Sequence, residues 1–246
     1  MKKGWVAGAG AALLLAAGLM LLPGGQAEGD GQVNPMLYAD VPLESSHFQN
    51  IMEARTLGLM TGYPDNKFGP SVKLNRANVV KAFGKYIEQT TGKKVSEFDL
   101  SGVEPFSDVP PDARDQELYQ YSLLVKKEGI FQGSNNRLMP SEYISRRQMA
   151  MVLVRAFDLP DLTDVQSKVT DLSPDFGEED RRAINILSKH RITTVSEFRP
   201  RETTSRGQFA SFLVASYHAV HEEHTPPEVT GIEIEETENT SNEPAS

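Results

Sequence analysis

The feature that most constrains the fold of this chain is a short segment that occurs three times. LNRANVVKAF, ISRRQMAMVL and TSRGQFASFL begin at residues 74, 144 and 204, and each has an arginine at its third position, namely Arg76, Arg146 and Arg206. A proline lies six residues before each arginine, and an apolar residue lies two residues before each proline. Because proline makes up only about 5% of residues in ordinary proteins, this ordered recurrence indicates an internal repeat.

An aspartate in a short turn motif opens each repeat. The segments YADVP, FSDVP and VTDLS carry Asp40, Asp108 and Asp171, which precede the three arginines by 36, 38 and 35 residues. This spacing predicts three repeats separated by linkers. The predicted repeats span residues 38–92, 106–160 and 169–220, and the predicted linkers span 28–37, 93–105 and 161–168.

Each repeat is predicted to contain two helices joined by a loop. After the aspartate turn of the first repeat, Phe48, Ile51 and Ala54 share one helix face. A glycine follows each of the first two such segments, where a left-handed residue ends a helix, and the third repeat has an arginine there. The three helix-end positions hold Gly58, Gly129 and Arg191. The corresponding apolar helix face carries Leu118, Tyr121 and Val125 in the second repeat and Ile184 and Leu187 in the third.

The recurrent arginine segment is predicted to begin the second helix. Ser145 with Gln148, and Ser205 with Gln208, fit a capping box, in which the serine accepts from a helix amide and the glutamine reaches back. Asn75 supplies the cap of the first copy without an equally long reciprocal partner. The segment is therefore expected to be the same structural element in all three repeats.

An apolar stripe follows each predicted helix start. Three positions spaced by four residues are apolar in every repeat, which suits the packing of helix on helix. One helix pair cannot bury such a stripe alone. The sequence therefore predicts an all-α fold of three helix-loop-helix repeats packed together. The three positions hold Val79, Met149 and Phe209, then Phe83, Leu153 and Leu213, then Ile87, Phe157 and Tyr217.

The two ends of the chain differ from the repeats. Residues 1–27 place two lysines before an apolar run and end in small residues, which predicts a secretory signal peptide cleaved after Ala27. The run also approaches the roughly 20 residues that span a bilayer, so an uncleaved membrane anchor is the alternative. Residues 221–246 hold eight acidic residues and no lysine or arginine. They are predicted to form a disordered acidic tail.

Composition and motifs argue against several classes of function. The chain has no cysteine, and its net charge of -9 gives no basic excess for binding nucleic acid. Nucleophile elbows, phosphate-binding loops and zinc-protease motifs are absent from the sequence. His218, His221 and His224 follow one another at steps of three, which spreads them around a helix. No catalytic residue, metal site or cofactor is therefore predicted.

Taken together, the motifs resemble the S-layer homology domain. The resemblance rests on Asp-Val-Pro, on Gly-Tyr-Pro-Asp before an aromatic residue and a proline, and on the Ser/Thr-Arg-x-Glu/Gln helix start, and it covers about residues 38–220. The family implies a pseudo-threefold bundle with a non-catalytic anchoring role. Its grooves between repeats bind a secondary cell-wall polysaccharide that carries a pyruvate ketal on N-acetylmannosamine.

The resemblance also implies a location and partners. It places the protein outside the cell, in the cell wall or S-layer of a bacterium, with no membrane contact after the signal is cleaved. The pyruvylated polysaccharide is the implied partner, and other surface proteins are a second class of partner.

By the family pattern, Arg76, Arg146 and Arg206 contact the ketal carboxylate. A guanidinium can hold a carboxylate through two hydrogen bonds. A helix start with unpaired amides adds partial positive charge beside it. The alternative is that these arginines form ordinary exposed ion pairs.

Five further residues are assigned to the grooves by the same resemblance. Gly62 and Gly133 let the backbone approach the sugar. The three repeat-opening aspartates brace the groove or bond to sugar hydroxyls, with simple turn capping as the alternative. These aspartates are Asp40, Asp108 and Asp171.

Departures from the family pattern leave other functions open. The usual glutamate of the helix start is Asn78, Gln148 or Gln208, and the shorter third loop has Val195 where the others have glycine. The three grooves are therefore not expected to be equally competent. A secreted scaffold protein with degenerate grooves is the second hypothesis, and a hydrolase of wall glycan is the third.

Overall fold

The structure, a computed structural model, describes residues 37–221, and this range is helical without a named strand. This confirms the predicted all-α class. The predicted signal peptide, nearly all of the first linker and all but the first residue of the predicted acidic tail lie outside the described residues. The helices are α1 Phe48–Thr56, α2 Arg76–Thr91, α3 Gln116–Lys127, α4 Arg146–Ala156, α5 Glu178–Lys189 and α6 Arg206–His221, with a short 3-10 helix η1 at Val95–Glu97.

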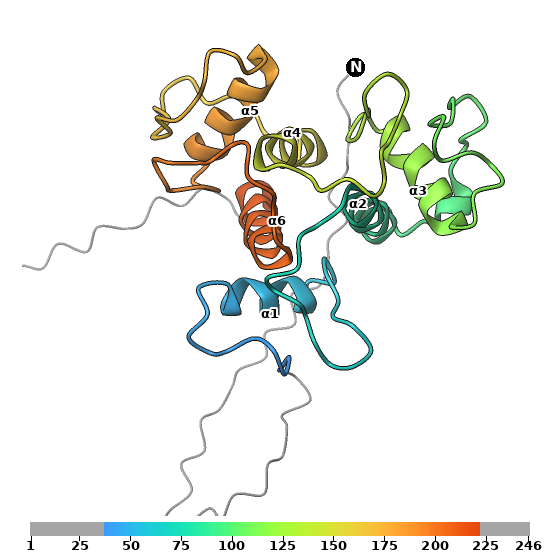
Figure 1. Cartoon of the computed structure of the whole chain (residues 1–246), viewed down its shortest axis with the longest axis horizontal. Helices are drawn as coiled ribbons and strands as arrows, with labels where there is room; N and C mark the ends of the chain where they lie inside the picture. Colours follow the sequence, from blue (N-terminus) through green and yellow to red (C-terminus); the bar gives the residue numbers. More distant parts are fainter. Residues whose placement is uncertain (1–36, 222–246) are drawn as a thin grey trace, which may run out of the picture.

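The second helix of each repeat lies at the centre of the molecule, and the first helix lies outside it (Figure 1). The packed pairs are α2 with α3, α4 with α5, and α1 with α6. Each outer helix therefore packs on the central helix of the preceding repeat, and α1 packs on the last helix of the chain. No repeat contains a complete helix pair of its own, so the repeats depend on one another for burial.

Three backbone hydrogen bonds join the repeats in a closed cycle. The amide of Leu74 donates to Thr204 at 2.9 Å, that of Thr204 donates to Ile144 at 3.0 Å, and that of Ile144 donates to Leu74 at 3.0 Å. Each residue precedes the arginine of its central helix by two positions. The cycle brings the three helix starts together although 130 residues separate Leu74 from Thr204 in sequence.

The predicted apolar stripes form the core between the central helices. Val79, Met149 and Phe209 have no exposed surface. The ring of Phe83 lies edge-on to Phe209 at a centroid distance of 6.0 Å and edge-on to Phe157 at 6.4 Å. Aromatic pairs of this geometry stabilise a core beyond the area that they bury. The stripes therefore meet as predicted, and each repeat contributes to one shared core.

The predicted helix ends are confirmed. Ser145 and Gln148 form the complete capping box, and the Asn75 side chain accepts from the amide of Asn78 at 2.9 Å. Gly58 and Gly129 have φ of 70° and 69° at the ends of α1 and α3. Arg191 takes the same left-handed conformation, with φ of 57°, after α5. Among residues 37–221 no helix has both the length and the apolar character needed to cross a membrane.

Candidate functional site

The three aspartates hold the loops that precede the central helices. Both carboxylate oxygens of Asp40 accept from consecutive amides, those of Phe68 at 2.7 Å and Gly69 at 2.8 Å. Asp108 holds residues 138 and 139 in the same way, and Asp171 holds residues 198 and 199. Two successive amides that converge on one carboxylate form a small anion nest. Each aspartate therefore fixes the loop of its own repeat and its oxygens are occupied within the protein, whereas a role toward a sugar stays a prediction.

Each of the three arginines reaches from its helix start into the loop of the next repeat. The Arg76 Nε donates to the Leu138 carbonyl at 2.5 Å, and its guanidinium lies 4.8 Å from the ring centroid of Phe131. Arg206 closes the cycle, because its Nε donates to the Phe68 carbonyl at 2.7 Å. The arginines thus lie at the junctions between repeats.

Arg146 departs from this pattern. Its guanidinium lies 4.9 Å from the Phe198 ring centroid, but its buried Nε has no hydrogen-bond partner among the described residues. Arg206 is the opposite case, because its terminal nitrogen also donates to the Thr61 carbonyl at 2.9 Å. The three junctions therefore differ in the hydrogen bonds that their arginines make within the protein.

The prediction of unpaired amides at these helix starts is wrong. The amide of Arg76 donates to the Glu142 carbonyl at 2.9 Å, and that of Ala77 donates to the Pro140 carbonyl at 3.0 Å. The third amide is used by the cap, and the starts of α4 and α6 are arranged in the same way. Carbonyls of the neighbouring repeat occupy the donors, so only the side chains remain for an anion.

Electrostatics at the arginine positions favour an incoming anion. Burial lowers the pKa of Arg76, an effect that the charges of Glu142 and Asp108 partly oppose. Desolvation also lowers the pKa of Arg146 and of Arg206. An arginine stays charged in proteins nonetheless. None of the three forms an ion pair with a described residue, so their charges are balanced only at longer range.

Gly62 and Gly133 lie against aromatic rings of the aspartate turns. A Cβ atom on Gly62 would lie 2.3 Å from Tyr38 Cε1, and one on Gly133 would lie 2.7 Å from Phe106 Cε1. Both would also come within 2.7 Å of a backbone carbonyl oxygen. Close packing within the loop thus accounts for these glycines, and only Gly133 lines a hollow described below.

The third loop does not place Val195 at the glycine position. The residue that accepts from the aspartate turn is Asn66 in the first repeat, Asn136 in the second and Ser196 in the third. The glycines precede this residue by four and three positions, whereas Val195 directly precedes it. The backbone contacts therefore show that Val195 is not the equivalent of the two loop glycines. The aspartate turn of the third repeat also differs, because it has Val169 where the other turns have an aromatic residue.

A hollow of about 430 Å³ opens beside Arg76. It brings together Arg76 and Gly133 from the predicted site with Arg147 and Arg155 of α4, which the sequence reasoning did not assign. Arg147 Nη1 pairs with Asp180 at 2.6 Å, and Arg155 pairs with Glu179. The Arg76 charge is the unpaired one of the three. The other six predicted site residues do not line this hollow.

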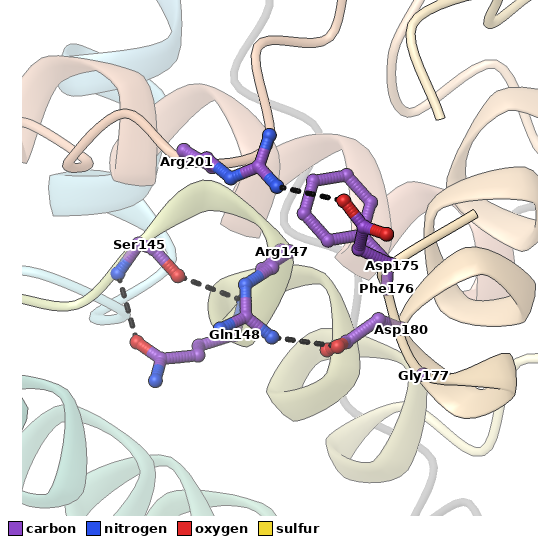
Figure 2. Close-up of a pocket in the computed structure, with 8 residues that line it drawn as sticks. All are labelled: Ser145, Arg147, Gln148, Asp175, Phe176, Gly177, Asp180 and Arg201. Carbon is purple, nitrogen blue, oxygen red and sulfur yellow. Dashed lines mark hydrogen bonds and ion pairs between the residues drawn. The ribbon is translucent and has the colours of Figure 1, made fainter. Parts of the chain in front are cut away.

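A second hollow, of about 390 Å³, lies beside the first at the starts of α4 and α5 (Figure 2). Its side chains include Arg147, Gln148, Asp180 and Arg201. None of these was assigned to a site from the sequence. Two features of the sequence could have pointed to this hollow. One is Arg147, the second arginine of ISRRQ, and the other is Arg201, which follows the loop proline where the other repeats have serine.

The histidines at the end of α6 contact protein groups. His218 Nε2 lies 2.5 Å from Glu53 of α1, and the His221 ring stacks on Tyr217 with a centroid distance of 4.0 Å. His224 lies outside the described residues. Within 37–221 no group of three histidine, aspartate or glutamate side chains is arranged to hold a metal ion.

These observations define a class of protein: an all-helical module of three interlocked repeats, with arginines and hollows at the repeat junctions. Residues 37–78 match the family model for the S-layer homology domain. The resemblance to this family that the motifs indicated is therefore confirmed over residues 37–78. The match covers the aspartate turn, the loop and the start of the central helix in the first repeat.

Two S-layer proteins are similar to the chain. An S-layer protein of Bacillus licheniformis is 27% identical over 193 residues, which is 74% of this chain and 20% of that protein. S-layer protein EA1 of Bacillus anthracis is 28% identical over 161 residues, which is 63% of this chain and 17% of that protein. The chain thus spans about a fifth of the length of these relatives.

Proposed function

We propose that this chain is a non-catalytic anchoring module at the bacterial cell surface, which binds a pyruvylated secondary cell-wall polysaccharide in the groove beside Arg76. The S-layer homology domain and the two S-layer proteins among its relatives support the surface location and the anchoring role. The polymer and the contacts to it are the specific part of the proposal.

The observation that carries the proposal is the unpaired charge of Arg76 in a hollow. Its Nε is held by Leu138 and its guanidinium plane by Phe131, so the side chain is fixed in one orientation. No described residue accepts a hydrogen bond from its terminal nitrogens. A guanidinium fixed in this way is suited to a carboxylate, because the two form parallel hydrogen bonds with little further ordering. A pyruvate ketal supplies one carboxylate on an otherwise neutral sugar.

The remaining lining suits a saccharide. The volume of about 430 Å³ falls in the range of small-molecule sites. Gln148 offers an amide, and Met151 and Val152 offer apolar surface to the carbon face of a sugar ring. The paired charges of Arg147 with Asp180 and of Arg155 with Glu179 supply donors and acceptors for hydroxyl groups.

Co-sedimentation of the chain with purified bacterial walls tests this function. We expect binding to intact walls and much weaker binding after mild acid has removed the pyruvate ketals. Binding that is equally strong after ketal removal would contradict the carboxylate contact of Arg76, and absence of binding to any wall preparation would contradict the anchoring role.

A secreted scaffold role is the second candidate. The observation that favours it is the occupation of groups that a polymer would otherwise use. All six oxygens of the three repeat-opening aspartates accept backbone amides, and Arg206 donates to two carbonyls. Capture of a surface protein by a chain that fails to bind walls would favour this role.

A further inference from the structure

We propose that the hollow at the starts of α4 and α5 is a second saccharide subsite, which takes a carboxylate-bearing sugar between Arg147 and Arg201 and a sugar hydroxyl on Asp180. This inference rests on the proposed function, because it assigns a second contact along the same acidic polymer. The hollow has a volume of about 390 Å³ and is lined mainly by polar residues.

The two arginines face a single aromatic side chain. The guanidinium carbon of Arg201 lies 4.7 Å from the ring centroid of Phe176, and that of Arg147 lies 5.7 Å from it. Figure 2 shows both arginines beside Phe176 and the carboxylates that flank it. Contact with a ring orients a guanidinium without using its hydrogen-bond donors. The ring therefore occupies none of the donors of the two side chains, one of which Arg147 Nη1 gives to Asp180.

The charge of Arg201 is only weakly compensated. Its Nη2 lies 3.9 Å from Asp175 Oδ2, and both side chains are mostly exposed. Exposed pairs at such distances contribute little. A sugar carboxylate that accepts two hydrogen bonds from Arg201 would be a better partner, because bidentate charge-assisted bonds are the stronger kind.

Asp180 provides an independent observation that points to a ligand. The residue is 7% exposed, and its Oδ2 pairs with Arg147 Nη1 at 2.6 Å. Its Oδ1 is buried and has no hydrogen-bond partner among the described residues. A buried carboxylate oxygen without a donor is costly. Asp180 lines the hollow, and because Oδ1 itself has almost no accessible surface, a sugar hydroxyl donates to it once the carboxylate turns toward the hollow.

The other two junctions lack these groups. The positions equivalent to Arg147 hold Ala77 and Gly207, and those equivalent to Arg201 hold Ser71 and Ser141. At the junction of α6 with α1, a Cβ atom on Gly207 would lie 2.9 Å from the ring of His47, so that space is already filled. The residues of the proposed subsite are thus particular to one junction and do not follow from the repeat pattern.

The subsite is continuous with the groove beside Arg76. The two hollows share Arg147, Gln148, Gly177 and Asp180. A polymer that enters the Arg76 groove can therefore extend into the second hollow with its next sugars. Two weak contacts on one polymer combine into tighter binding, because the second contact is intramolecular.

Arg201→Ala in the full chain tests the subsite, since the exposed side chain can be removed without disturbing the core. The measurement is the Kd for purified pyruvylated wall polysaccharide by calorimetry. We expect a loss of about fivefold, the size of one partly exposed charge-assisted contact. Arg201→Glu is expected to lose more and Arg201→Lys less. Arg182→Ala is the matched control, because Arg182 is exposed and lies on α5 outside both hollows.

Treated polymers identify the source of the carboxylate. If it is the ketal, Arg201→Ala will bind ketal-free polymer as the unaltered chain does. If it is a uronic acid, the difference will persist on ketal-free polymer and vanish after chemical reduction of the carboxyl groups.

The outcomes separate this inference from the proposed function. Equal affinity of Arg201→Ala, Arg201→Glu and the unaltered chain would overturn the subsite and leave the Arg76 groove intact. Loss of affinity in Arg182→Ala as large as that in Arg201→Ala would also overturn it, because a general charge effect would then explain both. Failure of the unaltered chain to bind any wall polymer would overturn both proposals.

Discussion

Asp40 and Arg206, which belong to the first and last repeats, bind opposite ends of the same residue. Asp40 accepts from the Phe68 amide at 2.7 Å, and Arg206 donates to the Phe68 carbonyl at 2.7 Å. The loop of the first repeat is therefore fixed by its own aspartate and by the arginine that arrives from the far end of the chain. Asp108 and Arg76 hold Leu138 in the same way.

This relationship predicts that Asp40 stabilises the fold as a whole. Asp40→Ala leaves the amides of Phe68 and Gly69 without their partner, and Phe68 is fully buried. We expect the free energy of unfolding to fall by about 2–4 kcal/mol, since hydrogen bonds to charged groups contribute about 1.5–3 kcal/mol each and water replaces part of them. Urea denaturation followed by circular dichroism measures the change. Asp112→Ala is the control on an exposed position, and an equal effect there would contradict the bracing role.

Gly62 is predicted to be intolerant of even one methyl group. In Gly62→Ala the new Cβ would lie 2.3 Å from Tyr38 and 2.7 Å from the Lys67 carbonyl oxygen, so the loop must shift. We expect a loss of about 1–3 kcal/mol, the usual range for an overpacked site. Gly102→Ala is the matched control, because nothing lies within 4 Å of its Cβ position. A thermal melt of Gly62→Ala that matches that of the control would show that the loop repacks freely.

Local features of this fold were predictable from sequence, and contacts between repeats were not. The cap of Ser145 and the left-handed Arg191 depend on a few neighbouring residues, so their patterns sufficed. The packing of α1 on α6 depends on chain segments that are far apart, and the spacing of apolar residues does not specify a partner. The same limit explains the occupied amide of Arg76, whose acceptor Glu142 lies in another repeat.

The site was predictable to a similar extent. Arg76 and Gly133 meet in one hollow, because Arg76 begins the central helix of the first repeat and Gly133 lies in the loop of the second repeat, which faces it. Arg147 of the second repeat and Arg201 of the third have no arginine at the equivalent positions of the other repeats. A comparison that looks for shared residues therefore does not detect them. Their proximity depends on the tertiary fold, through the contact of each with Phe176.

The contact between α1 and α6 is predicted to weaken as the pH falls. Burial lowers the pKa of His47 below its ordinary value of 6.5, and its Nδ1 lies 2.9 Å from Ser211 Oγ. The unfolded chain therefore binds more protons than the folded chain near this pH, so stability rises with pH in this range and is lost as pH drops below about 6.5.

His47→Gln removes the titratable group, and it leaves the contact of His218 with Glu53 in place. We expect the unaltered chain to lose more stability than His47→Gln between pH 7.5 and pH 5, as followed by urea denaturation at each pH. Parallel pH profiles for the two proteins would show that His47 titrates alike in the folded and unfolded states.

Arg76 and Arg206 are predicted to respond differently to the same substitution. Lysine keeps the charge but loses the planar fork that holds a carboxylate through two bonds. Arg206 uses its donors on the carbonyls of Phe68 and Thr61, so Arg206→Lys should lower stability by about 1–2 kcal/mol for the lost bonds and leave wall binding unchanged. Arg76 gives only its Nε to the protein, so Arg76→Lys should cost less stability but weaken binding to pyruvylated walls about tenfold.

Thermal melts and co-sedimentation of the two variants measure both quantities on the same samples. Each variant serves as the control for the other, because position, charge and substitution are matched by the repeat. Weaker binding in Arg206→Lys with no change in Arg76→Lys would move the carboxylate contact to the junction that joins the last repeat to the first. Equal weakening in both would indicate that the polymer responds to the stability of the closed ring and not to the free donors of Arg76.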